Sequence, residues 1–377
     1  MNTLKLTPLH LQKAKDDLLK VITTNFGSNL KTLEDAPDEL RDDDDIIIAS
    51  LKVHSLALKV ASKRIQADRS IVMISVKNYG DTLEYACTAL QDDDEVVFEA
   101  TKKYSTALKY ASDRIKDNRE FAVDLIKRKK QCLQFMSPRL KDDREIVLIC
   151  LALDGRQLEH ASERLKNDDE LVDIAVTANG WTMETLSHKY KNDRTLAMKA
   201  LNSKPSSFSF LSEELKNDKQ ILEYILARDG HTMYSCSPHI KDNRYFCLIA
   251  VKQNGMAINN CSIKMQYDIG VILEALTNRG DILRCLPSIF KYNKDVVERA
   301  CLTSSDSFKY AAASLRKDKD FIIYLYEKNI DVSHYILDEL KEEIGNLSTL
   351  DYIKSSLLKE KLDFSLAEKP KSSKLKI

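Results

Sequence analysis

The chain lacks a net charge and any long apolar run. Its 377 residues carry 58 basic and 58 acidic side chains, so no overall field draws the molecule toward nucleic acid or an anionic membrane. No signal-like apolar stretch opens the chain, and no run reaches the roughly 20 residues that span a bilayer. We therefore expect a cytoplasmic protein without a membrane partner, or one delivered by a route that needs no cleavable signal.

The sequence also lacks the motifs of disulfide frameworks and of enzymes. None of the eight cysteines forms a Cys-x-x-Cys pair, and most, such as Cys150 and Cys247, fall in apolar positions. They are expected to be reduced thiols of a hydrophobic core. A phosphate-binding glycine loop, a nucleophile elbow and a His-x-x-x-His pair are all missing. We predict no catalytic residue, no metal site and no cofactor.

What the sequence does contain is a block of 25 residues repeated twelve times without insertion or deletion. Each block opens at an apolar residue followed by a short polar run, as in Leu140-Lys-Asp-Asp. The openings fall at residues 40, 65, 90, 115, 140, 165, 190, 215, 240, 265, 290 and 315, and positions 1 to 25 are counted from each of them. A fixed period in this range indicates a stacked repeat array.

The first half of each block predicts a helix. Position 4 is Asp or Asn in every block, and these residues cap helix N-termini. Position 3 is often acidic as well, so the cap could lie at either position. Positions 7, 8, 11 and 12 form one apolar stripe. Glycine at position 16 in six blocks indicates a left-handed helix stop, so this helix should run about 11 residues.

A second, shorter helix is expected over positions 17 to 25. Position 19 is apolar in eleven blocks, and the next opening residue continues the face of position 22. Neither helix is long enough to be stable alone in water, so each must bury its stripe against the next pair. The predicted fold class is all-α, an α-solenoid of about thirteen 25-residue helix-turn-helix repeats.

The repeat pattern predicts four segments. Residues 1–39 should form an N-terminal cap with a degenerate repeat, residues 40–339 the twelve tandem repeats, and residues 340–367 a C-terminal cap. Residues 368–377, which are rich in lysine and serine, are expected to be a disordered tail.

The repeat unit resembles a known family. The segments that carry the resemblance are Leu-Lys-Asp-Asp-Arg-Glu-Ile-Val-Leu (140–148), Ala-Val-Lys-Gln-Asn-Gly (250–255), Ala-Leu-Lys-Tyr-Ala-Ser (107–112) and Leu-Glu-His-Ala-Ser-Glu-Arg-Leu (158–165). Together they are similar to the tandem repeats of domain of unknown function 4116 (DUF4116) over roughly residues 40–340. The resemblance implies a repeat protein without an assigned activity or cofactor. Lys130, Pro205 and Ile269-Gly270 depart from the pattern, and the stacking is expected to bend or loosen there.

Charged residues suggest binding sites but also have structural explanations. The Asp run at 42–45 lacks the spaced acids and turn glycine of a calcium loop, so helix capping is the favoured interpretation. The cluster Lys127, Arg128, Lys129 and Lys130 could contact phosphates, but it also suits a helix C-terminus. Basic residues recur at positions 2 and 5 and could follow a nucleic-acid backbone as one ridge. Local ion pairing with the acids at positions 3, 4 and 6 is favoured.

Position 21 carries an aromatic residue or histidine in seven blocks. The row consists of Tyr85, Tyr110, Phe135, His160, Phe210, Tyr310 and Tyr335. On a concave face such a row could grip a peptide or stack on bases, but packing against the second helix is favoured. Trp181, at position 17, is either an exposed anchor or a wedge between blocks.

These observations favour a non-enzymatic scaffold that binds a protein or peptide partner. The candidate binding residues are Tyr85, Tyr110, Phe135, His160, Trp181, Phe210 and Tyr310. RNA binding through the basic ridge and the aromatic row is the alternative, with Lys127 to Lys130 as its basic cluster. The family resemblance adds a third hypothesis, a secreted effector of an intracellular bacterium that binds a host protein in the host cytosol.

Overall fold

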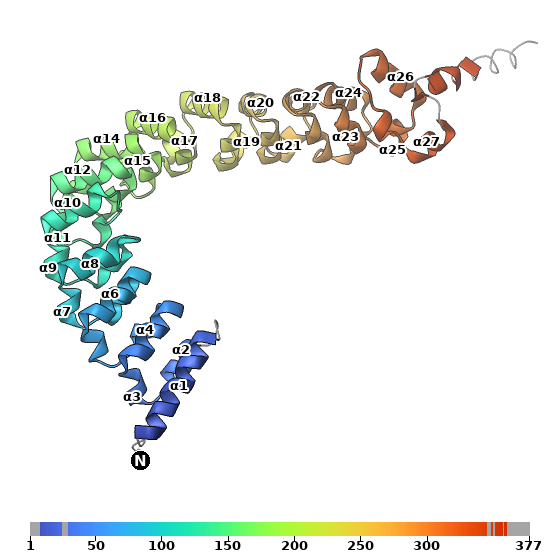
Figure 1. Ribbon diagram of the computed structural model, residues 1–377. Coiled ribbons are helices and arrows are strands. Elements are labelled where there is room, and N and C mark those ends of the chain that lie inside the picture. Colours follow the sequence, from blue (N-terminus) through green and yellow to red (C-terminus); the bar gives the residue numbers. More distant parts are fainter. Residues whose placement is uncertain (1–7, 25–28, 345–347, 350, 357, 360–377) are drawn as a thin grey trace, which may run out of the picture. The chain divides into compact units, whose positions relative to one another are not determined.

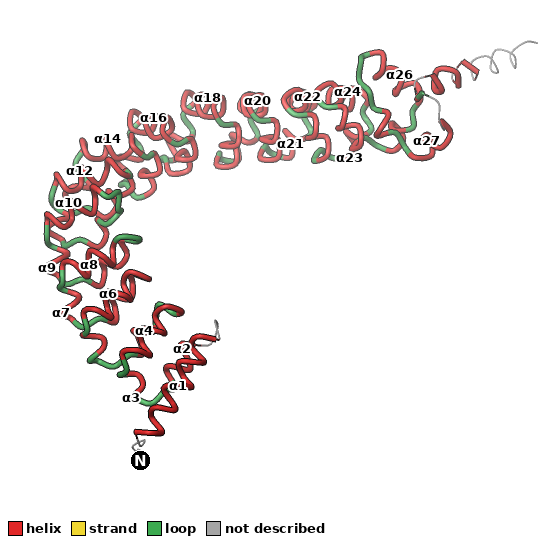
Figure 2. The backbone as a smooth tube through the Cα atoms, in the orientation of Figure 1, coloured by secondary structure: helices red, strands yellow, loops and turns green. Residues whose placement is uncertain are grey.

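The computed structural model describes residues 8–24, 29–344, 348–349, 351–356 and 358–359, which contain helices and turns but no strand (Figure 2). The chain divides into two compact units, residues 1–186 and 187–377. Each unit is a stack of the 25-residue blocks, with the helices labelled in Figure 1. The predicted tail, residues 368–377, lies outside the described residues.

Each block contains one main helix, which spans positions 5 to 14 in most blocks. In the first unit these helices are α4 (Asp44–Val53), α6 (Arg69–Asn78), α8 (Asp94–Thr101), α10 (Arg119–Lys127), α12 (Arg144–Leu153) and α14 (Asp169–Ala178). In the second unit they are α16 (Arg194–Ser203), α18 (Lys219–Arg228), α20 (Arg244–Gln253), α22 (Ile269–Asn278), α24 (Lys294–Thr303) and α26 (Lys319–Glu327).

The residue at position 4 caps the main helix in all twelve blocks. Asp143, for example, accepts hydrogen bonds from the backbone N–H groups of Glu145 and Ile146 at 3.0 and 3.2 Å. The same bond to position 6 or 7 is made by every other Asp or Asn at position 4. The capping prediction is therefore confirmed, and position 4 rather than position 3 is the cap.

The second helix is not continuous, so the prediction of one helix over positions 17 to 25 was wrong. A 3₁₀ helix comes first. These segments are η2 (Gly80–Tyr85), η3 (Ser105–Tyr110), η4 (Leu133–Phe135), η5 (Gly155–His160), η6 (Gly180–Glu184), η7 (Pro205–Phe210), η8 (Gly230–Ser235), η9 (Gly255–Asn260), η10 (Gly280–Arg284), η11 (Ser305–Tyr310) and η12 (Ser333–Tyr335), while the first block has α5 (Ala57–Val60).

A single turn of helix then leads into the next block. These turn helices are α3 (Asp38–Arg41), η1 (Ile65–Ala67), α7 (Thr88–Gln91), α9 (Asp113–Lys116), α11 (Pro138–Lys141), α13 (Glu163–Lys166), α15 (His188–Lys191), α17 (Glu213–Lys216), α19 (Pro238–Lys241), α21 (Ile263–Gln266), α23 (Ser288–Lys291) and α25 (Ala313–Arg316).

The serine at position 23 explains the break between the two segments. Ser162 has an extended backbone, and its hydroxyl accepts a hydrogen bond from the N–H of Leu165 at 3.3 Å, so it caps the turn helix. Its own N–H donates to the carbonyl of Lys141 in the preceding turn helix at 2.9 Å. Because that N–H bonds to the turn helix at the start of the same block, it cannot continue the 3₁₀ helix.

The glycine at position 16 is not a left-handed stop, contrary to prediction. The residue before Gly155, Asp154, is extended with a φ of −160°, and Gly155 itself begins η5. None of the glycines at 80, 155, 230, 255 and 280 has a φ in the left-handed region. A Cβ built on Gly155 would lie 1.9 Å from the carbonyl oxygen of Ala175. Glycine is required because the next main helix approaches closely.

Left-handed backbone occurs instead at position 15 of two blocks without that glycine. Lys129 and Asn329 have φ values of 59° and 62°. After them, the N–H of Lys130 bonds to the Leu125 carbonyl at 3.2 Å, and that of Ile330 to the Leu325 carbonyl at 2.9 Å. This is the bond pattern of a Schellman helix end.

The other two departures from the pattern leave the element bounds unchanged. Pro205 is the first residue of η7. Proline is tolerated there because the N–H group of the first helical residue has no partner within the helix. Ile269 and Gly270 lie in the first turn of α22, which is capped by Asp268 like its neighbours.

Apolar side chains at positions 7, 8, 11 and 12 form the core, as predicted. In α12, Ile146, Val147, Cys150 and Leu151 are all buried, and burial stabilises by about 1.5–3 kcal/mol for each large aliphatic side chain. All eight cysteines are free, and six of them are buried.

The N-terminal segment packs on the first block. Helix α1 (Pro8–Thr24) lies against α4, and α2 (Asn29–Glu34) against α5. Lys15 of α1 pairs with Asp43 at 2.7 Å and with Asp45 at 2.8 Å. At the other end, α27 (Asp338–Ile344) follows η12. The cap boundaries predicted at residues 39 and 340 stay predictions.

Candidate functional surfaces

The turn helices form one edge of each unit, and a polar triad links successive turns along it. The triad consists of positions 3, 23 and 25 of one block. In the block at 140, the carboxylate of Asp142 accepts hydrogen bonds from the Ser162 hydroxyl and from Arg164 Nε, the latter at 3.1 Å. The Arg164 guanidinium also donates to the Asp142 carbonyl at 2.9 Å. The hydrogen bond from Ser162, and then that from Arg164, lower the pKa of Asp142.

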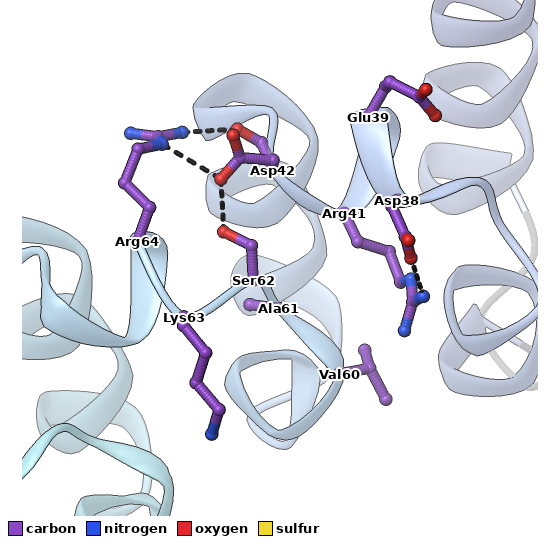
Figure 3. Close-up of a pocket in the computed structure, with 9 residues that line it drawn as sticks. All are labelled: Asp38, Glu39, Arg41, Asp42, Val60, Ala61, Ser62, Lys63 and Arg64. Atoms are coloured by element: carbon purple, nitrogen blue, oxygen red, sulfur yellow. Dashed lines mark hydrogen bonds and ion pairs between the residues drawn. The ribbon is translucent and has the colours of Figure 1, made fainter. Parts of the chain in front are cut away.

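The complete Asp–Ser–Arg triad recurs in four blocks of the first unit, whereas the block at 65 has Ala67, Cys87 and Ala89 at these positions. It is formed by Asp42, Ser62 and Arg64 (Figure 3), by Asp92, Ser112 and Arg114, by Asp117, Ser137 and Arg139, and by Asp142, Ser162 and Arg164. In the second unit, Asn192 with Ser212 and Asn217 with Ser237 keep the serine contact. Asp242, Ser262 and Lys264 form a weaker version, with the lysine 3.7 Å from the carboxylate.

The blocks at 265 and 290 replace this triad by apolar residues. Position 3 becomes Tyr267 and Tyr292, and positions 23 and 25 of the first of these blocks become Pro287 and Ile289. Since positions 3 and 25 are in contact in six other blocks, Tyr267 and Ile289 occupy adjacent places on the edge. The Tyr267 ring also lies 5.7 Å from that of Phe290, measured between centroids.

Apolar side chains face solvent on and beside α21 and α23, and two of them, Ile263 and Ile269, lie outside the triad positions. Exposed fractions are 75% for Ile263, 66% for Ile289 and 62% for Tyr292, and the side chains of Tyr267 and Ile269 are also exposed. We call these five residues the apolar patch. A contiguous group of exposed apolar side chains marks an interaction surface more often than single exposed residues do.

A cavity of about 560 Å³ lies beside the first triad (Figure 3). Its lining is mostly charged, and the charges pair with one another: Asp38 with Arg41, and Asp42 with Arg64. The hydrogen bond from Ser62 is the main cause that lowers the pKa of Asp42. A general acid needs a raised carboxyl pKa, which Asp42 does not have.

The predicted aromatic row is half-buried throughout. The seven side chains at position 21 end the 3₁₀ helices and are neither fully buried nor fully exposed. Lys109 Nζ lies 4.4 Å from the centroid of the Tyr110 ring. Burial lowers the pKa of His160 and raises that of Tyr85. Tyr85, Tyr110, Phe135 and His160 lie in successive blocks of the first unit, on the 3₁₀ helices η2 to η5, each of which contacts the next. In the second unit, Phe210 lies four blocks from Tyr310. Trp181, at the start of η6, is exposed.

The basic cluster lies at the C-terminal end of α10. Arg128 pairs with Asp124 at 3.1 Å, and its guanidinium lies 4.5 Å from the centroid of the Phe98 ring. Lys130 Nζ donates to the carbonyl of Lys103 at 2.9 Å. These contacts tie the cluster to the neighbouring helix α8.

Arginines at position 5 pair with the cap of the next block instead of forming a free basic ridge. Arg144 Nε lies 3.3 Å from Asp168, and the same pairing is made by Arg69, Arg119, Arg194 and Arg244. Their charges are thus offset locally, as the ion-pairing interpretation predicts.

The described residues contain no group of three or more His, Cys, Asp or Glu side chains placed to hold a metal ion. None of the described helices is long and apolar enough to cross a membrane.

The repeated main helix, 3₁₀ helix and turn helix define an α-solenoid repeat protein. A family model for a domain of unknown function (DUF4116) matches residues 51–91, 68–116, 93–141, 143–191, 193–241 and 243–291. Most of these matches span two of the 25-residue blocks, and together they cover more than half of the chain. The chain belongs to the DUF4116 family. Among curated proteins and solved structures, no significant match is found.

Sequence reasoning missed the apolar patch. The signal was present in the triad positions, where Tyr267, Tyr292 and Ile289 place large apolar side chains in a series that is polar in most other blocks. It could be interpreted only once the contact between positions 3 and 25 was known.

Proposed function

We propose that the protein is a non-enzymatic scaffold that binds a protein partner, with the apolar patch as the contact surface. The observation that carries the proposal is the replacement of the polar triad by Tyr267, Pro287 and Ile289. The half-buried row at position 21 and Trp181 are secondary candidate contacts. Buried free thiols favour a reducing compartment, which fits the cytoplasm or, for a secreted effector, the host cytosol.

The patch is not required by the repeat itself. The block at 240 fills positions 3, 23 and 25 with Asp242, Ser262 and Lys264 and has the same helix bounds. Apolar side chains at these positions therefore add exposed apolar area without completing the core. A partner that covers this area stabilises the complex by about 25 cal/mol for each Å² of apolar surface removed from water.

The chemistry of the patch favours a protein partner with apolar side chains. Tyrosines contribute large contact areas at interfaces, and interface centres are depleted of charge. The five side chains are too few for a complete interface of roughly 800 Å² on each partner. We infer that they form its centre and that polar residues of neighbouring turn helices form its rim.

The test restores the polar triad in place of the patch. The triple variant Y267D/P287S/I289R carries the same residue types as Asp142, Ser162 and Arg164, so it should fold. A photo-crosslinking residue at position 292 would capture the partner in a lysate, and mass spectrometry would identify it. We expect the triple variant to lose that partner, while the control R164A, on the turn edge of the first unit, keeps it.

Retention of the same partner by the triple variant would overturn the proposal. So would crosslinks at position 292 that disappear on nuclease treatment, because they would place nucleic acid on this edge. Circular dichroism of both variants checks that the helices are intact.

A further inference from the structure

Lysine occupies position 13 in four consecutive blocks of the first unit. Lys52, Lys77, Lys102 and Lys127 lie in the last turn or at the end of α4, α6, α8 and α10. The next two blocks have Ala152 and Thr177 there. Four more cations follow at positions 14 to 16: Lys103, Arg128, Lys129 and Lys130. We call these eight residues the basic rim.

Side chains connect these helix ends into one surface. The Asn78 amide donates to the Leu51 carbonyl at 2.9 Å. Lys103 Nζ reaches the Asn78 carbonyl at 3.5 Å, and Lys130 Nζ reaches the Lys103 carbonyl at 2.9 Å. Figure 1 shows α4, α6 and α8 side by side within this unit, consistent with their packing. The cations of the rim therefore form a continuous stretch.

Few acids offset the rim. Positions 9 to 17 of the same four blocks hold three acids, Asp81, Glu99 and Asp124, against the eight cations. Glu99 pairs with Lys102 at 2.5 Å and Asp124 pairs with Arg128 at 3.1 Å. Among the described residues, no carboxylate lies within ion-pair distance of the remaining lysines: Lys52, Lys77, Lys103, Lys127, Lys129 and Lys130.

Helix ends account for only part of this charge. The C-terminus of a helix carries roughly half a negative charge, so four helix ends offset about two of the excess positive charges. The excess of cations over acids is five. The remaining charge is available for an external anion, in a chain whose net charge is zero.

Two exposed tyrosines lie on the rim between the lysines. Tyr79 and Tyr104 occupy position 15, and their exposed fractions are 41% and 65%. Tyr79 follows Lys77-Asn78 and Tyr104 follows Lys102-Lys103, and both have extended backbone just beyond the helix. Cations that contact phosphates and aromatic rings that stack on bases are the two elements of a single-strand binding surface.

We propose that the basic rim binds single-stranded nucleic acid, with the lysines on phosphates and Tyr79 and Tyr104 on bases. A duplex keeps its bases stacked inside and offers them no contact. An anionic membrane could contact the lysines, but it has no bases to stack on the two tyrosines. The proposal rests on the first unit alone and is independent of the apolar patch in the second.

Fluorescence anisotropy of the full chain with a labelled 15-nucleotide uridine RNA, over a series of potassium chloride concentrations, is the first test. Binding should weaken as salt rises, with a slope of log K against log salt of roughly −0.7 for each phosphate contact. The variant K77E/K103E/K127E should lose binding. The control K252E changes the lysine at position 13 of the block at 240, in the second unit, and should bind as wild type does.

The role of the tyrosines is tested separately. Y104A should bind about 5- to 150-fold more weakly if one base stacks on the ring. The control Y234A removes an exposed tyrosine of the second unit and should have no effect. All substituted positions are exposed, and circular dichroism checks that the variants fold.

Three results would overturn the proposal. The first is an absence of RNA binding at 25 mM salt. The second is equal affinity for a 15-base-pair duplex together with no effect of Y104A, which would leave a purely electrostatic surface. The third is cosedimentation with vesicles containing phosphatidylserine, lost in the triple lysine variant, without any RNA binding; this would assign the rim to a membrane surface.

Discussion

Gly155 lies directly against the carbonyl oxygen of Ala175 in the next main helix, 1.9 Å from where a Cβ would be. The same contact is made by Gly80 with Ala100 and by Gly230 with Ala250. Along the sequence, glycine at position 16 is followed in the next block by alanine at position 11 in all six cases. Blocks without that glycine are followed by Ser75, Leu125, Cys150, Ile225 or Leu325. The two positions thus vary together as one close-packed pair.

The first prediction concerns this pair. Gly155→Ala should destabilise the first unit by about 1–3 kcal/mol, because the added methyl group pushes η5 away from α14. Urea denaturation followed by circular dichroism measures the effect. The control Ser305→Ala, at the same position but with a Cβ already in place, should cost much less. Equal midpoints for Gly155→Ala and wild type would contradict the close-approach explanation.

Loss of a helix cap should have a smaller effect that asparagine avoids. Asp143→Ala removes the bonds to the N–H groups of Glu145 and Ile146, at a cost of about 0.5–2 kcal/mol. Asp143→Asn should keep most of the stability, since Asn118 caps α10 in the same way. Thermal melting of both variants separates the cap from the charge, and an equal loss in both would assign the effect to the ion pair with Arg119.

The polar triads predict sensitivity to acid. The bonded serine, and then the arginine, lower the pKa of Asp92, Asp117 and Asp142 in the folded protein. A carboxyl group with a lowered folded pKa stabilises the fold above its unfolded pKa of about 3.9, and the contribution is lost as the pH falls through the folded pKa.

Melting temperatures between pH 7 and pH 2 would measure this effect. The variant D142N cannot titrate, so its melting temperature should fall less steeply than that of wild type below pH 4. Parallel curves for the two proteins would show that the triad carboxylate does not contribute.

Thiol reactivity should divide the cysteines into distinct classes. Cys285 is exposed, whereas Cys132, Cys150 and Cys301 are buried and burial raises the pKa of each to about 12. An aromatic disulfide reagent at pH 8 should therefore modify Cys285 quickly and Cys87, which is half-buried, more slowly. The six buried thiols should react only after denaturant is added; rapid reaction of most thiols in the native protein would contradict the buried core.

Much of the fold was predictable because it depends on residues close in sequence. The cap at position 4 bonds to N–H groups two or three residues later, as in Asp143, and the stripe at positions 7, 8, 11 and 12 follows from helical periodicity. The candidate surfaces were less predictable. Lys127 to Lys130 stood out as a run, but Lys52 and Lys77 join them only because neighbouring helix ends lie side by side.

The sequence by itself determined the period, the caps, the core positions and the all-α class, since each is set by local geometry and by the pattern of apolar residues. Only the tertiary structure explains why position 16 is glycine. Gly155 has no room for a Cβ because the carbonyl of Ala175, twenty residues later in the next block, lies against it. It also decided that Ser162 interrupts the second helix, since the N–H of Ser162 bonds to Lys141 of the preceding turn. The first contact is made with the next block, and the second joins residues 21 positions apart within one block. The apolar periodicity of a single helix carries no information about either.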